Sequence, residues 1–202
     1  MIAIVDYHVG NLGSVTNACK RQGMDVVVTN DPEVIRQADG IILPGVGAFP
    51  AAMSNLEACH LVPVLNEVKD KGTPILGICI GMQLLFEEGS ENGYTKGLEF
   101  LKGSVDKMEV DAKLPHMGWN QLVIKQSHPL LKYVEEGDYV YFVHSYSAHC
   151  PEDEIGAYVN YGGKKITAFV YKDNVMGTQF HPEKSGEIGK KILRAFKELV
   201  SC

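Results

Sequence analysis

The sequence predicts an α/β fold whose central sheet is mixed but mostly parallel, is flanked by helices, and carries an antiparallel β addition. In the first part of the chain, short apolar runs alternate with helix-like segments. After about Gly89, glycine-rich or acidic turns separate the apolar runs instead. Repetition of strand, helix and strand is typical of a parallel sheet with helices on both faces, whereas strands joined by short turns pair in antiparallel fashion.

The parallel part of the sheet comes from short apolar runs that predict buried strands. These runs are Ile2 to Val5, Val26 to Thr29, Ile41 to Leu43 and Ile75 to Ile78. Between them we expect one helix from Leu12 to Gln22. A second helix begins at Asp31-Pro32-Glu33, because an N-cap residue is followed there by a proline that fits the first helical turn.

The later part of the chain predicts hairpins and antiparallel strands. The expected strands are Tyr139 to Val143, Ile166 to Tyr171 and Val175 to Phe180. The turns that separate strands in this part are Glu91-Asn92-Gly93, Glu136-Gly137-Asp138 and Tyr161-Gly162-Gly163.

A final amphipathic helix closes the chain. Ser185 is a plausible cap for it, and one apolar stripe is formed by Ile188, Ile192, Phe196 and Leu199. Since no internal repeat, low-complexity tract or linker interrupts the pattern, we expect residues 1–202 to form one domain.

Composition narrows the classes of partner. The 19 Lys and Arg residues against 25 Asp and Glu give a net charge of -6, which disfavours a broad electrostatic grip on nucleic acid or anionic lipid. The 5 cysteines include no CxxC pair, which indicates reduced thiols in a cytoplasmic protein. No apolar run approaches the roughly 18 residues that a membrane span needs, so we expect no membrane segment.

The most informative motif is Gly77-Ile78-Cys79-Ile80-Gly81, which follows an apolar strand and precedes a helix-like segment from Met82 to Phe86. A sharp strand-to-helix turn exposes one side chain at the end of the strand, and flanking glycines tolerate the crowding there. The positive end of the following helix and a nearby imidazole would favour a thiolate at Cys79. The motif therefore predicts a cysteine nucleophile, whereas an isolated cysteine is more often an inert buried residue.

A second motif, His181-Pro182-Glu183, supplies a base and a carboxylate two residues apart. Glu183 can orient the His181 ring and stabilise its charged form, as the acid of a catalytic triad does. The two motifs together predict a triad of Cys79, His181 and Glu183.

Backbone amides complete the predicted site. The Ile80 amide follows the nucleophile and would face an oxyanion, and the loop from Pro44 to Phe49 can offer the second amide. Its Gly45-Val46-Gly47 core is not a dinucleotide fingerprint, because the third glycine is missing. His116, His144, His149 and Cys150 lack the spacing of known metal motifs, so we predict no metal and no cofactor.

These motifs resemble class I glutamine amidotransferases, and within them the family of glutaminase subunits of imidazole glycerol phosphate synthase. The resemblance covers the chain from Met1 to the final helix. It rests on Asp6-Tyr7 with Gly10-Asn11-Leu12, Leu43 to Phe49, Gly77 to Leu85, Pro115-His116-Met117-Gly118-Trp119-Asn120, His144-Ser145-Tyr146 and Gln179 to Ser185. The departures are His8-Val9 in the first loop and Ile80 in place of leucine.

The resemblance implies a flavodoxin-like amidotransferase fold that hydrolyses L-glutamine to glutamate and ammonia through a thioester on Cys79. His181 would move the protons and Glu183 would hold its ring. By the same resemblance, the oxyanion hole comes from Val46, Gly47 and Ile80, and the residues that hold the substrate are Gly45, Gln83, Glu91, His144, Ser145 and Tyr146. Without the resemblance, Glu91 could equally be a solvated loop residue.

A partner is also implied, because ammonia released into water near pH 7 is mostly protonated and no longer nucleophilic. The resemblance implies a heterodimer with a (βα)8 cyclase, which makes imidazole glycerol phosphate and aminoimidazole carboxamide ribotide in histidine biosynthesis. The face that meets the cyclase would include Trp119, Asn120, Tyr141 and Lys184.

Two alternatives stay open at this level. The chain could serve another synthase, such as the one that makes pyridoxal phosphate, with the same triad. It could also be a non-catalytic module on the same fold, although such modules commonly lose a triad member and this sequence retains all three.

Overall fold

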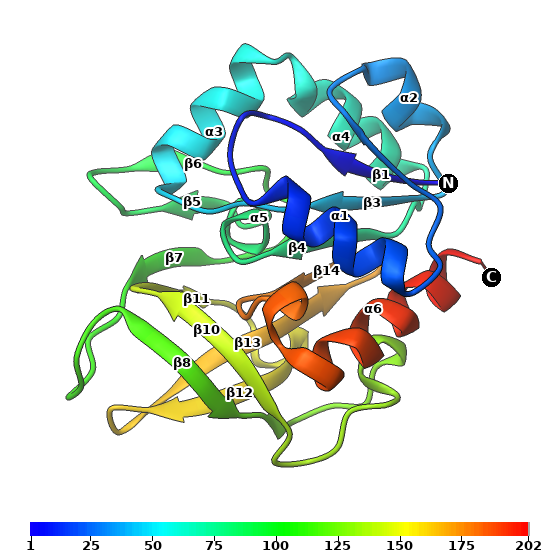
Figure 1. Cartoon of the computed structure of the whole chain (residues 1–202). Helices are drawn as coiled ribbons and strands as arrows, with labels where there is room; N and C mark the ends of the chain where they lie inside the picture. Colours follow the sequence, from blue (N-terminus) through cyan, green and yellow to red (C-terminus); the bar gives the residue numbers. More distant parts are fainter. Residues whose placement is uncertain (202) are drawn as a thin grey trace.

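The computed structural model describes residues 1–201, so the predicted free thiol of Cys202 lies outside the described residues. Its central feature is an eight-stranded sheet with the order β2-β1-β3-β4-β14-β13-β12-β9 (Figure 1). The parallel half contains β2 (Val26–Thr29), β1 (Ile2–Val5), β3 (Gly40–Leu43), β4 (Ile75–Ile78) and β14 (Val175–Thr178). The antiparallel half contains β13 (Lys164–Lys172), β12 (Ile155–Tyr161) and β9 (Val123–Ile124). The predicted mixed, mostly parallel α/β sheet is confirmed.

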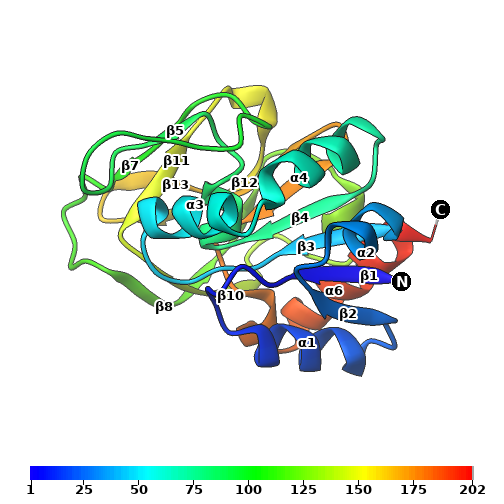
Figure 2. The ribbon, with the colours of Figure 1, turned by 90° about the horizontal axis from the view of Figure 1, so that it is seen from above.

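Helices cover both faces of the parallel half, as Figure 2 shows from above. One face is covered by α1 (Leu12–Arg21) and α6 (Gly186–Val200), and the other by α2 (Pro32–Gln37), α3 (Phe49–Ala58) and α4 (Leu61–Asp70). The predicted cap of α2 forms, since Asp31 accepts a hydrogen bond from Glu33 N, and Asn11 caps α1 by accepting one from Ser14 N.

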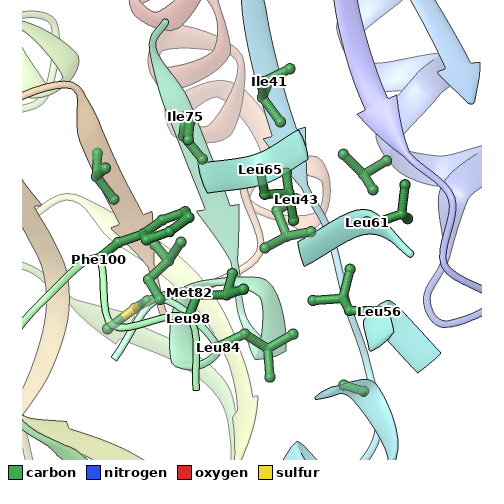
Figure 3. Packing of buried hydrophobic residues seen from close by; sticks show 14 of the residues in the cluster. Ile41, Leu43, Leu56, Leu61, Leu65, Ile75, Met82, Leu84, Leu98 and Phe100 are labelled. Carbon is green, nitrogen blue, oxygen red and sulfur yellow. The ribbon is translucent and has the colours of Figure 1, made fainter. Parts of the chain in front are cut away.

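Strand alternation divides the core into two clusters. Ala3 and Val5 of β1 pack with α3 and α4, whereas Ile2 and Ile4 pack with α1 and α6. Figure 3 shows the first cluster, in which Ile41 and Leu43 of β3 meet the α3–α4 side. Both faces of β1, β3 and β4 are buried, which explains why their sequences are apolar without alternation, whereas the edge strand β2 is half-buried with Val28 exposed.

Two smaller sheets extend this framework. A two-stranded ribbon pairs β8 (His116–Gln121) with β10 (Tyr139–His144) in antiparallel fashion. A four-stranded sheet has the order β11-β7-β5-β6, from β11 (Tyr146–His149), β7 (Ser104–Lys107), β5 (Glu88–Gly89) and β6 (Thr95–Lys96). The short helices are α5 (Ile80–Gln83), η1 (Pro129–Leu131), η2 (Glu152–Glu154) and η3 (Pro182–Lys184).

The structure differs from the sequence predictions in several elements. The helix expected from Met82 to Phe86 is instead the four-residue α5, which ends at Gln83. The strand expected to end at Phe180 ends at Thr178, because the chain then leaves the sheet toward η3. The helices α3 and α4 were not predicted; His60 separates them with a positive φ of 56°, which breaks their periodicity.

Ser185 occupies the N-cap position of α6 as predicted, but its side chain does not cap the helix. Its hydroxyl donates to the carbonyl of His181 over 2.6 Å and accepts from Tyr141 N over 2.9 Å. The serine therefore ties the segment after β14 to the ribbon strand β10.

Within residues 1–201, none of the helices combines the length and the apolar character that crossing a membrane requires.

Candidate active site

The predicted nucleophile and base meet because their strands are neighbours. β4 and β14 run parallel with Ile78 opposite Thr178, and the Cys79 amide donates to the Thr178 carbonyl over 2.8 Å (Figure 1). Cys79 follows β4 directly, and His181 follows β14 after two residues. Since the carboxyl ends of parallel strands lie at one edge of a sheet, both side chains emerge at the same place.

Cys79 sits in a strained turn between β4 and α5. Its backbone has φ 54° and ψ -110°, which is unusual for a residue with a side chain. The flanking glycines make this turn possible. A Cβ at Gly81 would lie 1.7 Å from the Leu43 carbonyl oxygen, and one at Gly77 would lie 2.6 Å from the Gly81 carbonyl oxygen. The predicted elbow therefore forms, and close backbone packing explains both glycines.

His181 and Glu183 form a buried pair. His181 Nδ1 and Glu183 Oε1 are 2.7 Å apart, and the two side chains are only 1% and 2% exposed. The other ring nitrogen, Nε2, is buried and makes no hydrogen bond to any described residue. The backbone amide of His181 donates to the Tyr141 carbonyl over 2.9 Å, and this bond fixes the backbone from which the ring projects.

The surroundings favour the protonated form of this ring. Burial alone would lower the pKa of His181, but hydrogen-bonding and charge interactions with Cys79 and with Glu183 outweigh it and raise the pKa to about 9. The sulfur is thus near enough to act on the ring, although it is not in hydrogen-bonding geometry with Nε2 in this state. A thiol and an imidazole placed in this way can share one proton.

Gln179 also contacts the sulfur, which the sequence analysis missed. This fully buried residue donates from Nε2 to Cys79 Sγ over 3.7 Å. Sγ also lies 4.0 Å from the Val143 carbonyl oxygen. The signal available in the sequence was a polar residue placed directly after an apolar strand and two positions before the histidine.

A cavity of about 300 Å³ opens beside the sulfur. It is lined by Val46, Gly47, Cys79, Ile80, Gln83, Glu91, Pro115, Val143, His144, Ser145, Tyr146 and His181. Nearly all the predicted oxyanion and substrate residues therefore surround one space. Gly45 is an exception, since it packs beneath the cavity, where a Cβ would lie 2.5 Å from the Tyr7 hydroxyl. A larger cavity of about 590 Å³ contains none of the predicted residues, so the chemistry points to the smaller one.

Gln83 and Glu91 occupy defined positions in this cavity. Gln83 Nε2 donates to the Tyr146 carbonyl over 3.2 Å and to Gln179 Oε1 over 2.9 Å. Its Oε1 is buried without a described partner, so an acceptor is available there. Glu91 Oε2 accepts from Phe49 N at the start of α3 over 2.9 Å. This contact disfavours the alternative of a merely solvated Glu91.

The loop between β3 and α3 forms the remaining edge. The Tyr7 hydroxyl donates to the Pro44 carbonyl and anchors the start of this loop. Burial raises the pKa of Tyr7, and the nearby Cys79 charge adds to that shift, so the tyrosine stays a neutral donor. Gly47 adopts φ 110°, a conformation open to glycine, and Val46 beside it is exposed.

Three of the four predicted partner residues lie together on the outer face of the ribbon. Trp119 is 54% exposed, its ring packs edge-on against Tyr141 at 5.9 Å, and Lys184 Nζ lies 6.0 Å from the Tyr141 ring centroid. Met117 and Tyr139 add exposed apolar surface there. The fourth residue, Asn120, faces the other way, toward His116 and the Asn160 carbonyl.

No group of three or more His, Cys, Asp or Glu side chains in residues 1–201 could hold a metal ion. His116 and His144 are hydrogen-bonded to each other. Cys19, Cys59, Cys79 and Cys150 are free thiols.

Comparison with known proteins gives a family for this geometry. The family described as "Glutamine amidotransferase class-I" matches residues 3–199. A Lactococcus lactis subsp. lactis (strain IL1403) protein named "Imidazole glycerol phosphate synthase subunit HisH" is 54% identical over 197 residues, which cover 98% of each chain. A protein of the same name from Bacillus cereus (strain G9842) is 53% identical over 202 residues, covering 100% of this chain and 96% of the relative.

Solved structures agree on the fold. One described as "Crystal structure of glutamine amidotransferase" superposes with a TM-score of 0.79 over 100% of both chains at 18% identity. "Structure of PurLQS from Thermotoga maritima" gives a TM-score of 0.73 over 98% of this chain and 97% of the other, at 20% identity. The chain therefore belongs to the class-I glutamine amidotransferases, in the family of HisH subunits of imidazole glycerol phosphate synthase.

Proposed function

We propose that this chain hydrolyses L-glutamine to glutamate and ammonia through a thioester at Cys79, with His181 and Glu183 as the other members of the triad. The observation that carries the proposal is the meeting of the elbow cysteine and the buried His181–Glu183 pair beside one cavity of about 300 Å³. A non-catalytic module would have no need for a strained cysteine next to an unpartnered ring nitrogen.

The first step forms the thioester. Cys79 Sγ attacks the side-chain carbonyl carbon of glutamine, while His181 Nε2 holds the thiol proton. When the tetrahedral intermediate collapses, the carbon–nitrogen bond breaks, and the proton on His181 goes to the departing ammonia. The raised pKa of His181 suits this role, because the ring keeps the proton until the leaving group takes it. Glu183 orients the ring and stabilises its positive charge.

The second step releases glutamate. Water attacks the thioester carbonyl, His181 takes the proton from that water, and the carbon–sulfur bond breaks to regenerate the thiol. In both steps negative charge develops on the carbonyl oxygen. The Ile80 amide and an amide of the Val46–Gly47 pair would donate to that oxygen, a role supported by the position of all three residues in the lining of the cavity.

The head of the substrate would lie against Gln83 and the segment from His144 to Tyr146. The free Gln83 Oε1 is an acceptor suited to the α-ammonium group of glutamine, and Ser145 and Tyr146 offer backbone groups along the cavity. Glu91 adds a carboxylate near the same end while it also holds the start of α3. Gly45 acts indirectly, by keeping the loop close to Tyr7.

The ammonia would pass to a cyclase subunit in a heterodimer, where it supplies the nitrogen for imidazole glycerol phosphate and aminoimidazole carboxamide ribotide. The relatives carry the name of a subunit of imidazole glycerol phosphate synthase, which supports this partner over a pyridoxal phosphate synthase. The exposed Trp119 and Lys184, with the half-buried Tyr141 between them, supply an aromatic and cationic contact face, and Asn120 lies behind it. Free thiols support a reducing, cytoplasmic setting.

The test is to mix the purified chain with the cyclase subunit and glutamine and to measure glutamate release with and without the cyclase's nucleotide substrate. We expect release that depends on the cyclase and increases when its substrate is bound. If the chain stably binds and feeds only a different synthase, the choice of partner is wrong. If no glutamate forms in any combination, the glutaminase proposal itself fails.

A further inference from the structure

A chain of hydrogen bonds links the ribbon strand β8 to the cavity. Asn120 Nδ2 and His116 Nε2 are 3.3 Å apart, and His116 Nδ1 and His144 Nε2 are 3.0 Å apart. His144 Nδ1 then meets the Tyr146 carbonyl oxygen at 2.8 Å. This row of hydrogen bonds thus begins behind the exposed ribbon face and ends at a backbone group beside the cavity.

The donor and acceptor of each of these hydrogen bonds follow from the final acceptor, the Tyr146 carbonyl oxygen. A carbonyl oxygen only accepts, so His144 carries its proton on Nδ1. Burial lowers the pKa of His144 to about 3 and that of His116 to about 4, so both rings are neutral and each has one acceptor nitrogen. His144 Nε2 must therefore accept from His116 Nδ1–H, and His116 Nε2 must accept from Asn120. The Asn120 amide is oriented in turn by Gln121 N, which donates to Oδ1 over 2.8 Å, and by its own second N–H, which donates to Asn160 O.

The same carbonyl connects this chain to the reacting sulfur. Tyr146 O also accepts from Gln83 Nε2, whose other proton goes to Gln179 Oε1, and Gln179 donates to Cys79 Sγ. Both protons of the Gln83 amide are thereby used. Its Oε1 is left as a buried acceptor without a described partner, on a residue that lines the cavity, so the position of the Tyr146 carbonyl helps to decide which way the Gln83 carboxamide points.

We propose that His116 is a positioning residue for glutamine binding, which acts through His144 to hold the Tyr146 carbonyl and so the orientation of Gln83. His116 does not line the cavity and touches no reacting atom. The inference rests on the proposed glutaminase function and deepens it by assigning a role to a histidine that the sequence analysis weighed only as a metal ligand.

Two substitutions separate this role from simple packing. His116 stacks on Phe142 at 4.7 Å and on Tyr161 at 4.0 Å. His116→Phe keeps an aromatic ring in that stack and removes both nitrogens. His116→Asn loses the ring but places an amide N–H near the position of Nδ1, so it can still donate to His144. If His116 only fills space, the Phe variant should be the better enzyme. If His116 acts through its hydrogen bond to His144, which we call the relay, the Asn variant should be the better enzyme.

We expect His116→Phe to raise the KM for glutamine about tenfold with a smaller change in kcat, because loss of one buried hydrogen bond is of that size. His116→Asn is expected to stay within about threefold of the parent, since the donor is retained. The matched control is His128→Phe, which replaces a half-buried histidine that packs at a tilt against Phe169 and Tyr171 and is not among the residues that line the cavity, and its KM should be unchanged. All are measured as glutamate release from the full chain with saturating cyclase.

A second readout needs neither activity nor a variant. Nitrogen-15 correlation spectra of the imidazole rings distinguish the two neutral tautomers, and we expect His116 and His144 both to carry the proton on Nδ1. A proton on Nε2 of His144 would overturn the relay, even if His116→Phe failed to fold. An unchanged KM in a folded His116→Phe would also overturn it, with the glutaminase function intact. Absence of glutamate release from the parent chain would instead remove the proposed function, and the role of His116 with it.

Discussion

Two walls of the cavity are built in different ways. On the elbow side, Cys79 is held by backbone packing, with Gly77 and Gly81 so close to neighbouring carbonyls that no side chain fits. On the opposite side, the segment from His144 to Tyr146 is held by side-chain hydrogen bonds that reach back to the ribbon. A wall built from packed backbone is rigid and tolerates little change, whereas a wall built from side-chain hydrogen bonds can adjust. Cys79, the proposed nucleophile, thus has a fixed position, and the wall proposed to hold the substrate can respond to contacts on the ribbon.

The largest expected effect comes from breaking the rigid wall. Gly81→Ala places a Cβ 1.7 Å from the Leu43 carbonyl oxygen, so the elbow must move or the chain must unfold. We expect the free energy of unfolding to fall by about 3 kcal/mol and glutaminase activity to be lost. Urea unfolding measures the first effect.

The matched control for that change is Gly13→Ala in α1, where a Cβ would meet nothing within 4 Å. This substitution should leave stability unchanged or raise it by about 0.5 to 1 kcal/mol, because alanine is the better helix former. Equal losses in the two variants would show that close packing at the elbow is not the cause.

The next effect concerns the charge that supports His181. Glu183→Gln keeps an oxygen that can contact Nδ1 but removes the negative charge, so the imidazolium loses a stabilising partner. We expect kcat for glutamine to fall by about 10²- to 10⁴-fold with a small change in KM. The pKa of His181 should also fall, which ring-proton NMR titration would detect. An unchanged titration would mean that Glu183 does not support the charged ring.

A smaller effect is expected on the ribbon. Trp119→Ala should weaken binding of the cyclase by about 2 kcal/mol, or roughly 30-fold in Kd, because exposed aromatic anchors dominate such interfaces. Stability should change by less than about 0.5 kcal/mol, since the indole is exposed. The control is Tyr94→Ala, a more exposed aromatic (73%) away from the ribbon. Comparable losses of affinity in both variants would argue against a contact centred on Trp119.

The histidines of the molecule differ in how their protonation couples to stability. Burial lowers the pKa of His144 to about 3, and those of His116 and His128 to about 4, below the ordinary 6.5. Between about pH 6.5 and 4 the unfolded chain binds protons that the folded chain excludes, so stability falls as pH drops through this range. His181 acts in the opposite sense: its pKa of about 9 gives stability that is complete below pH 6.5 and is lost as pH rises toward 9.

Urea unfolding at a series of pH values measures both the loss of stability toward acid pH and the loss toward alkaline pH. The variant His128→Phe removes one of the histidines with a lowered pKa and leaves the residues that line the cavity unchanged, so it should reduce only the loss of stability toward acid pH. A parent chain whose stability is constant between pH 6.5 and 4 would contradict the neutral, buried state of these rings.

The sequence predicted the parts of the site that depend on local pattern. The elbow around Cys79 and the His-Pro-Glu turn have their own signatures, and parallel strands bring such turns to one edge. It did not reveal Gln179 or the second role of Ser185, because their partners, Cys79 and Tyr141, are distant in the chain. His116 was missed for the same reason: its tautomer is decided by a carbonyl 30 residues later, through His144.

Local pattern also failed where tertiary packing decides the element. The helices α3 and α4 follow a loop whose glycines favour a turn, and α5 ends after one turn because Leu84 and the residues after it pack into the core rather than continue the helix. The loop proposed to form part of the oxyanion hole was predicted from its glycines, but its anchor, the hydrogen bond from Tyr7 to Pro44, joins residues that follow two different strands, β1 and β3.

The central claim is that Cys79 is the nucleophile, and the most direct test is Cys79→Ser in the complex with the cyclase, measured with two nitrogen sources. The account predicts that glutamine-dependent turnover disappears, while turnover with added ammonia continues at nearly the parent rate because the cyclase is unaltered. Sustained turnover of glutamine by the serine variant would contradict it.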